Sequence, residues 1–188
     1  KFSKALPVVL ANYRLSDHWS AYGQLAEGFL TPPLAYFQAD HPESNRVKPQ
    51  TTTNYQLGTV YKTNRFNADF AGYFIRTHNL PVSIVNPNQT GIINQNDKIT
   101  LVARGAYYSG VEAQGTYYVG HGFSLFGNGS LNRATYEGSK RKIDGIPQAT
   151  AGYGFVFDRA GFFASLMAKY SGQYSLYTAA APSPDQPL

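Results

Sequence analysis

The residues of this chain best suited to acid–base chemistry are its four histidines. A serine hydrolase needs a nucleophile, a base and an orienting group within hydrogen-bond reach of one another. His18 and His121 fall in two short predicted turns, whereas His41 and His78 fall in two separate predicted outer loops. For His41 and His78, no second histidine or carboxylate sits at metal-site spacing. We therefore predict no catalytic residue, no metal site and no cofactor, and we expect that the protein is not an enzyme.

The amino-acid composition excludes several further classes of protein. The chain has no cysteine, which excludes disulfides, thiolate metal sites and thiol enzymes. Its 188 residues suffice for one domain, and a content of 15% aromatic against 14% charged residues excludes a disordered polymer. The net charge of +5 is modest and gives little support for nucleic-acid binding. No apolar run reaches the roughly 18 residues that a membrane-spanning helix requires.

The elements that must position any site follow from a period of two in the hydrophobic pattern. Between Thr51 and Thr63, rings and aliphatic side chains alternate with small or polar ones, and the alternation resumes from Phe66 to Phe74 after Asn64-Arg65. These two segments form a predicted hairpin. The same test predicts three more hairpins: Pro7–Leu15 with Trp19–Glu27, Tyr107–Val119 with Phe123–Glu137, and Gln148–Phe157 with Phe162–Tyr174.

The connections between the eight predicted strands alternate in length. Links within a hairpin have about three or four residues, whereas longer links run from Gly28 to Gln50, from about Asn79 to Lys98 and from Gly138 to Pro147, and a fourth begins after Tyr174. Short turns at one end and long loops at the other are typical of outer-membrane barrels, and not of soluble sandwiches with Greek-key links. We therefore predict an all-β fold, an antiparallel up-and-down meander of about eight strands that forms part of a transmembrane β-barrel.

The side chains agree with a bilayer. A strand in hydrocarbon must pair on both edges and turn apolar side chains outward, while its inward side chains can be polar. The predicted strands have the about 9 to 11 residues that crossing requires. Tyr13, Trp19 and Tyr61 lie on the apolar face near the short turns, where an interfacial girdle of rings is expected.

Several segments resemble the C-terminal barrel of TonB-dependent outer-membrane receptors. Trp19 to Phe29, followed by Pro32 and Pro33, looks like the family's strand running into a proline-marked loop. Pro49 to Gly58 is similar to the family's Pro-Glu-x-x-x-x-Tyr-Glu-x-Gly signature, with glutamines at its two acidic positions. Gly110-Val111-Glu112 matches a Gly-Val-Glu strand, and Ile146-Pro147 precedes a further strand as in the family.

The resemblance implies that residues 1–188 are part of a receptor barrel in the bacterial outer membrane. Barrels of this class have about 22 strands around a plugged lumen, and no plug domain, TonB-contacting segment or terminal aromatic strand is evident here. The parent protein would capture a large, scarce ligand such as a ferric siderophore, cobalamin or an oligosaccharide. Its partners would be that ligand, outer-membrane lipid and lipopolysaccharide, and the TonB complex acting through the plug domain.

Three groups of residues are candidates for contacts. The first predicted long loop offers rings and charges suited to stacking on a ligand. Cations at loop ends would lie near lipopolysaccharide phosphates. Charged residues on the polar strand faces would face the lumen and plug. The candidate ligand contacts are Phe29, Tyr36, Phe37, Asp40, His41 and Arg46. The candidate lipopolysaccharide contacts are Arg76, His78, Lys140, Arg141 and Lys142. The candidate lumen and plug contacts are Asp69, Glu112 and Lys169.

Two other readings remain open from the sequence. A complete eight-stranded outer-membrane barrel with an adhesive, structural or hydrolase role fits the strand count. A soluble all-β binding module would fold without detergent, whereas a barrel segment with an uncovered apolar face and open edges would aggregate.

Overall fold

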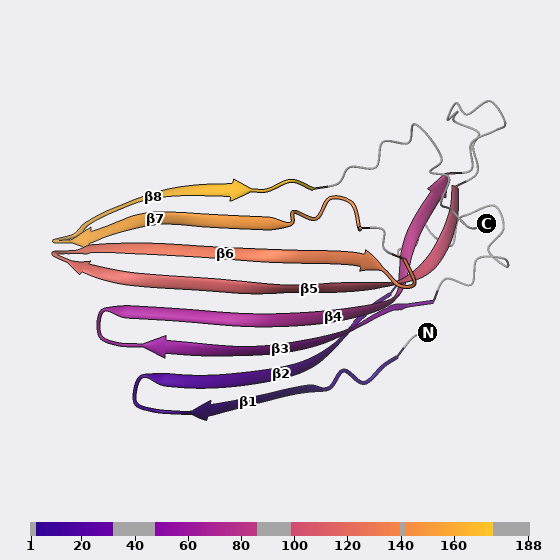
Figure 1. Cartoon of the computed structure of the whole chain (residues 1–188), viewed down its shortest axis with the longest axis horizontal. Coiled ribbons are helices and arrows are strands. Elements are labelled where there is room, and N and C mark those ends of the chain that lie inside the picture. Colours follow the sequence, from indigo (N-terminus) through magenta and orange to yellow (C-terminus); the bar gives the residue numbers. More distant parts are fainter. Residues whose placement is uncertain (1–2, 32–47, 86–98, 140–141, 175–188) are drawn as a thin grey trace.

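A computed structural model describes residues 3–31, 48–85, 99–139 and 142–174. These residues form one antiparallel sheet whose strand order follows the chain, β1 to β8 (Figure 1). The predicted meander of eight strands is confirmed. None of the described residues belongs to a helix that could span a membrane. The strands are β1 Val8–Arg14, β2 Trp19–Leu30, β3 Gln50–Lys62, β4 Phe66–Val85, β5 Ile99–Gly120, β6 Phe123–Tyr136, β7 Ala149–Arg159 and β8 Phe162–Ser171.

All four short turns lie at one end of the sheet, and the longer connections leave from the other end (Figure 1). The backbone conformation of the turn between β5 and β6 explains the two glycines in its Gly-His-Gly sequence. Gly120, His121 and Gly122 have φ values of 123°, 54° and 91°, in the left-handed region that glycine adopts without strain. A tight reversal at this point keeps β5 and β6 in register over most of their length.

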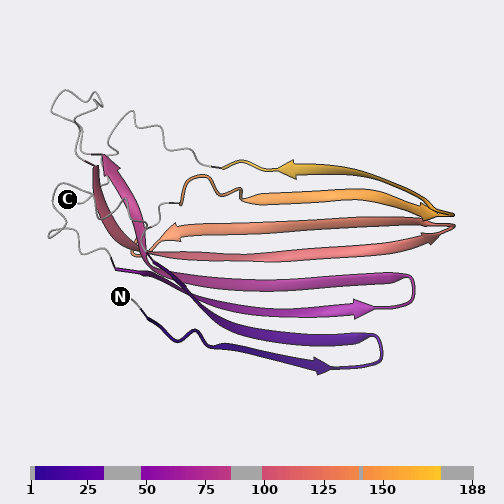
Figure 2. The same cartoon turned by 180° about the vertical axis from the view of Figure 1, so that it is seen from behind.

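Two predicted loop boundaries are wrong. β2 continues to Leu30, so Phe29 lies in a strand, and β4 continues to Val85, inside the predicted link between Asn79 and Lys98. A β-bulge between Thr77 and Leu80 explains the second error, because one extra residue in β4 breaks the alternation that marked the strand. Asn79 takes the left-handed conformation there, with φ of 56°. Beyond the bulge, the paired ends of β4 and β5 bend away from the other strands (Figures 1 and 2).

The two faces of the sheet differ in polarity. One face carries rings and aliphatic side chains that are largely exposed, such as Leu57 (73%) and Tyr153 (64%). The other carries amides, hydroxyls and carboxylates that are mostly half-buried. The buried hydrophobic residues of the described chain are Ala71, Ala106 and Ala134, and no second sheet covers the apolar face. The described residues therefore form no two-layered sandwich, which disfavours the soluble all-β module, because its apolar face would be exposed to water.

Rings gather at both limits of the apolar face. Next to the short turns, Trp19 meets Tyr61 edge to face at 5.7 Å between ring centroids, and Phe123 lies 4.6 Å from Phe157. Next to the loops, Phe74 stacks on Tyr107 at 5.8 Å. Eight residues separate the rows of Phe66 and Phe74, about 27 Å along a strand, or roughly 20 Å across the membrane at a tilt of about 40°. The two rows of rings thus bound an apolar band that is somewhat shorter than the about 25 Å typical of outer-membrane barrels.

The sheet is open at both margins. β1 and β8 lie at opposite edges and do not pair with each other (Figures 1 and 2). The reading as a closed eight-stranded barrel is therefore wrong, because closure requires the first and last strands to pair.

Candidate functional site

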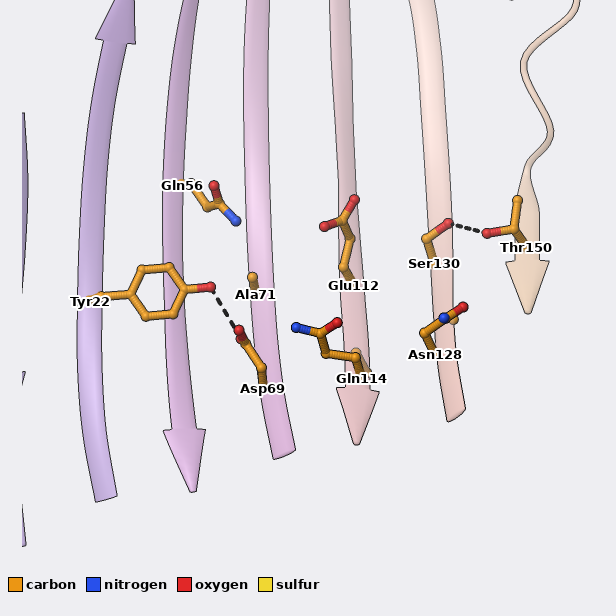
Figure 3. A pocket seen from close by; sticks show the side chains of 11 residues that line it. Tyr22, Gln56, Asp69, Ala71, Glu112, Gln114, Asn128, Ser130 and Thr150 are labelled. Carbon is orange, nitrogen blue, oxygen red and sulfur yellow. Dashed lines mark hydrogen bonds between the residues drawn. The ribbon is translucent and has the colours of Figure 1, made fainter. Parts of the chain in front are cut away.

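The polar face holds a shallow hollow of about 340 Å³ in the middle of the sheet (Figure 3). Strands β2 to β7 each contribute to it, because every second residue of a strand turns to the same face. Its polar lining residues are Tyr22, Gln56, Asp69, Glu112, Gln114, Asn128, Ser130 and Thr150. Such a surface is wettable and rich in hydrogen-bonding groups, as expected of a lumen wall.

Tyr22 links two strands that are not neighbours. Its ring extends from β2 over β3, and its hydroxyl donates a hydrogen bond to Asp69 Oδ1 on β4 at 3.1 Å (Figure 3). Gly58 lies directly opposite Tyr22 in the ladder. A Cβ at Gly58 would collide with the Tyr22 ring, so glycine is what allows the ring to cross β3.

Tyr73 repeats this arrangement one hairpin further along. The ring crosses β5 at Gly110, its partner in the ladder, and its hydroxyl donates to Asn132 Oδ1 on β6 at 2.8 Å. Asn132 in turn donates to Ser130 Oγ at 2.9 Å, and Ser130 shares a 2.8 Å hydrogen bond with Thr150 on β7. These contacts connect three strands, β4, β6 and β7, through side chains on the polar face.

The middle of this wall is acidic. Asp69 and Glu112 both line the hollow, and neither forms an ion pair within the described part of the chain. The Oδ1 atom of Asn54, on the same face, is buried without a hydrogen-bond partner among the described residues. Lys169 lies on the polar face as well, but on the edge strand β8. The wall therefore offers acceptors and negative charge to whatever lies inside.

At the loop end of the apolar face, three residues form a compact polar cluster. Glu137 Oε1 accepts hydrogen bonds from Arg76 Nη2 at 2.9 Å and from the Tyr107 hydroxyl. Arg76 also lies over the Tyr107 ring, 5.7 Å from its centroid. The hydrogen bond from Tyr107, and then that from Arg76, lower the pKa of Glu137 below its ordinary value. The charge of Arg76 is therefore already neutralised within the protein.

A second cluster lies at the loop end of the polar face. Arg104 extends over the Tyr136 ring at 5.8 Å from its centroid. Tyr108 lies on the same face, one row nearer the middle of the sheet. Rings and a cation at the mouth of a lumen can stack on a ligand and hydrogen-bond its edge.

The comparisons with known proteins agree with this geometry. The family described as TonB dependent receptor-like, beta-barrel matches residues 1–187. The chain belongs to the TonB-dependent receptor β-barrel family. Among curated proteins, none matches the chain significantly.

Solved structures of TonB-dependent receptors share the fold. The chain is similar to the copper transporter OprC, with 15% identity, a TM-score of 0.70, and coverage of 86% of this chain and 25% of OprC. It is similar to the ferric citrate transporter FecA, with 19% identity, a TM-score of 0.65, and coverage of 88% of this chain and 25% of FecA. It is similar to the ferripyoverdine receptor of Pseudomonas aeruginosa, with 18% identity, a TM-score of 0.69, and coverage of 89% of this chain and 22% of that receptor.

The chain thus spans about a quarter of the length of these receptors. The shared architecture and the family place this receptor barrel in the bacterial outer membrane.

Few of the predicted ligand-binding residues of this receptor segment can be placed. Phe29 lies in β2, opposite Thr51 and on the face of Leu25, which is the apolar face. The others lie outside the described residues: Tyr36, Phe37, Asp40, His41 and Arg46.

The predicted lipopolysaccharide contacts are placed only in part. His78 lies in β4 rather than in an outer loop, because β4 continues through the bulge. It shares the outward face with Arg76. Lys142 bridges Thr135 beside β6. Lys140 and Arg141 lie outside the described residues.

The structure does not bring together the histidines it describes. His18 and His121 lie at the short-turn end, and His78 lies at the loop end of β4. No group of three or more metal-ligating side chains is found in the described ranges. The described part of the barrel therefore assembles neither a catalytic triad nor a metal centre.

Sequence reasoning missed the two tyrosine crossings and the Arg104 and Glu137 clusters. The crossings depend on which glycine lies opposite which tyrosine, and this follows only from the strand register. Arg104 was missed because β5 begins at Ile99, whereas the predicted strand begins only at Tyr107. A regular alternation continues from Tyr108 through Ala106 to Arg104, and extending it would have found that residue.

Proposed function

We propose that the chain forms consecutive wall strands of a receptor for TonB-coupled uptake of a large, scarce ligand, such as a ferric siderophore, cobalamin or an oligosaccharide. The family and the transport roles named for OprC and FecA support this proposal. Residues 1–188 would be one part of a barrel of about 22 strands around a plug domain. Such a receptor performs no covalent chemistry, since it only binds its ligand and admits it.

One observation carries the proposal: a single open sheet has an exposed apolar face and a polar opposite face whose acidic groups form no ion pair within the described residues. In a closed barrel the apolar face contacts lipid and the polar face surrounds a lumen. A large barrel of this kind has room for a plug, which small barrels filled by their own side chains lack.

The polar wall is the proposed contact with the plug domain. Asp69, Glu112 and Lys169 face the lumen, and the buried acceptor of Asn54 lacks a donor within the described residues. A buried acceptor without a partner costs about 1–3 kcal/mol, so a donor from the plug would stabilise the closed receptor. Through the plug, the receptor would respond to the TonB complex.

Ligand capture is proposed at the loop end. The first long loop contributes Tyr36, Phe37, Asp40, His41 and Arg46, without Phe29, which lies on the apolar face of β2. At the loop end of the sheet, Arg104 and Tyr136 present a cation and a ring from the polar face. A ligand with an anionic edge and flat, polarisable groups would engage both.

The outward cations at the loop end are proposed to contact lipopolysaccharide. They are Arg76, His78, Lys140, Arg141 and Lys142. Arg76 is the weakest of these candidates, because Glu137 already neutralises it. The others would lie where lipid phosphates are found. Replacing all five by neutral polar residues would leave phosphate affinity unchanged if this contact does not exist.

Uptake in bacterial cells tests the function. The complete receptor containing this chain is expressed in cells without other such receptors, with and without the TonB complex, and supplied with a labelled ferric siderophore, cobalamin or maltooligosaccharide. We expect accumulation of one ligand class, abolished when TonB is deleted. Accumulation of no class, or accumulation independent of TonB, would contradict the proposal.

A variant pair then tests the ligand site. Arg104→Ala should weaken ligand binding to whole cells by about tenfold if it forms one charge-assisted contact. Arg65→Ala, a charge-matched change in the short turn at the opposite end, should leave binding unchanged. Equal affinities for the two variants would remove Arg104 from the site.

A further inference from the structure

The inward side of the sheet is not polar throughout. Near the short turns, the inward positions of β6, β7 and β8 carry large apolar side chains, which are Phe126, Val156, Phe163 and Met167. We call these four residues the apolar lumen patch. Strand parity and the ladder place them on the same face as Asn128, which lines the polar hollow. Phe163 is 66% exposed and Met167 is 71% exposed, so the described residues leave the patch largely uncovered.

Phe126 extends across a neighbouring strand, as the two tyrosines do. Gly154 lies opposite Phe126 in the ladder, and Met167 lies opposite Gly154 on the next strand. A Cβ at Gly154 would lie 2.7 Å from Phe126 Cζ, so the ring covers the glycine. The apolar lumen patch therefore continues across β7 without a polar side chain between Phe126 and Met167.

The same row of the ladder is polar on the other side of the sheet. Phe126 pairs with Thr116 on β5. From Thr116 the row continues through Asn67 on β4 to Lys62 on β3. The inward wall therefore changes from apolar to polar between β6 and β5. We call the polar part, from Lys62 to Thr116, the polar sector.

The acidic residues of the hollow adjoin the polar sector. Asp69 and Glu112 lie on β4 and β5, the strands that also carry Asn67 and Thr116 (Figure 3). Neither carboxylate forms an ion pair within the described ranges. Charged and amide groups on these strands can therefore be solvated by water wherever a partner in the lumen does not contact them.

The two parts of the wall hold a partner with different strength. Separating apolar surfaces exposes both of them to water, at a cost that grows with their area. Polar groups separate at little net cost, because water replaces the hydrogen bonds of the partner. Lipid does not reach the inward face, and large barrels of this class hold a plug there. The plug is therefore the partner that can cover the apolar lumen patch.

We infer that the plug domain is anchored on the apolar lumen patch, and that the path of the transported ligand opens along the polar sector. The plug surface that meets Phe126, Phe163 and Met167 is apolar. When the TonB complex acts on the plug, its contacts with the polar sector separate first, and water fills the gap beside Asp69 and Glu112. The inference rests on the proposed uptake function and adds the side of the wall along which the ligand passes.

Single cysteines in the complete receptor test it, because this chain has none of its own. Any cysteine elsewhere in the receptor is replaced by serine. Asn67→Cys places a thiol in the polar sector, and Ser165→Cys places one opposite Val156 in the apolar lumen patch. Asn67 and Ser165 are both exposed in the described part of the chain, so the two positions are matched.

Labelling is measured in cells that lack general porins, so that the receptor is the route for the reagent. A membrane-impermeant maleimide is added outside, with and without TonB. The cells are supplied with whichever of a ferric siderophore, cobalamin or a maltooligosaccharide they accumulate, and its uptake is measured in the same culture. Labelling of the denatured receptor corrects for differences in thiol reactivity.

We expect the ligand and TonB together to accelerate labelling of Asn67→Cys about tenfold and to leave Ser165→Cys unchanged. Burial of one large apolar side chain is enough to shift an equilibrium by about that factor. Met167→Gln, combined with Ser165→Cys, should raise the labelling rate toward that of Asn67→Cys. Ser171→Gln, on the same face of β8 but outside the patch, should not.

Three results would overturn the inference alone while uptake persists. They are equal acceleration at the two cysteines, faster acceleration at Ser165→Cys, and an unchanged rate after Met167→Gln. Absence of TonB-dependent uptake would overturn the proposed function together with the inference, so the two failures are distinguishable.

Discussion

Tyr73 on β4 reaches over β5 and donates a 2.8 Å hydrogen bond to Asn132 on β6. The contact joins strands that share no backbone hydrogen bonds, and it exists because the intervening residue is Gly110. The Tyr22 contact with Asp69 over Gly58 is built in the same way. A single-layer sheet has no core between two layers, so side-chain links of this kind resist bending of the wall between hairpins.

Removal of one hydroxyl tests that role. Tyr73→Phe should lower the free energy of unfolding of the reconstituted receptor by about 1 kcal/mol, the net worth of one hydrogen bond. The measurement is urea unfolding in lipid vesicles. Tyr153→Phe is the matched control, because Tyr153 is 64% exposed on the outward face and has no side-chain hydrogen bond within the described residues. Equal stabilities for the two variants would show that the crossing contributes nothing.

The glycine beneath the ring should be less replaceable than its neighbour. A Cβ at Gly110 would lie 2.5 Å from the Leu131 carbonyl oxygen and 2.7 Å from Tyr73 Oη, so Gly110→Ala should cost about 1–3 kcal/mol. Gly72→Ala, one ladder position away on the opposite face, should be neutral or stabilising because its surroundings are open. The same urea titration measures both. An unchanged free energy of unfolding for Gly110→Ala would mean that the Tyr73 ring moves aside without loss of stability.

The alternation of apolar and polar residues was sufficient to predict eight strands, their pairing order and the end that carries the short turns. It failed at Asn79, where the bulge adds one residue to β4 and shifts the pattern. A period-two pattern holds only while the register is unbroken, so strand segments beyond a bulge look like loops.

The candidate sites were less predictable than the strands. Asp69 and Glu112 could be assigned to the polar face from strand parity alone. The pairing of Arg76 with Glu137 could not, because these residues lie on β4 and just after β6, and they meet only through the register of three strands. Long-range pairs of this kind carry no signal in local sequence.

The Glu137 cluster should make stability depend on pH. Hydrogen bonds from Tyr107 and Arg76 lower the pKa of Glu137 from its ordinary value of 4.5, so the folded protein favours the charged form. Its contribution is present above pH 4.5 and is lost as the pH falls through the lowered pKa. Glu137→Gln should therefore be less stable than the parent receptor at pH 7.

Thermal unfolding in detergent between pH 7 and pH 3 measures this effect. The difference between the parent and Glu137→Gln should narrow as the solution is acidified. Asp17→Gln is the control, because Asp17 forms an exposed ion pair with Arg14 in a short turn at the opposite end. A Glu137→Gln difference that stays constant over this range would show that the carboxylate charge does not stabilise the fold.

The last prediction tests which face of the sheet contacts the membrane. Leu57 and Gln56 are neighbours on β3, but Leu57 faces outward with 73% of its surface exposed, and Gln56 lines the polar hollow. Leu57→Arg places a charge in hydrocarbon one row inside the loop-side limit of the band, so it should cost less than the about 2–4 kcal/mol expected at the midplane but more than the about 0–1 kcal/mol expected at the interface. Gln56→Arg places the same charge beside the acidic Asp69 and Glu112 and should be tolerated. Heat-modifiable mobility of outer-membrane fractions reports folded barrel, and we expect reduced folded protein only for Leu57→Arg. Less folded protein for Gln56→Arg than for Leu57→Arg would mean that the polar face is the one in contact with lipid. Water reaches a charge in the lumen but not a charge in hydrocarbon, so the more damaging arginine marks the lipid-facing side.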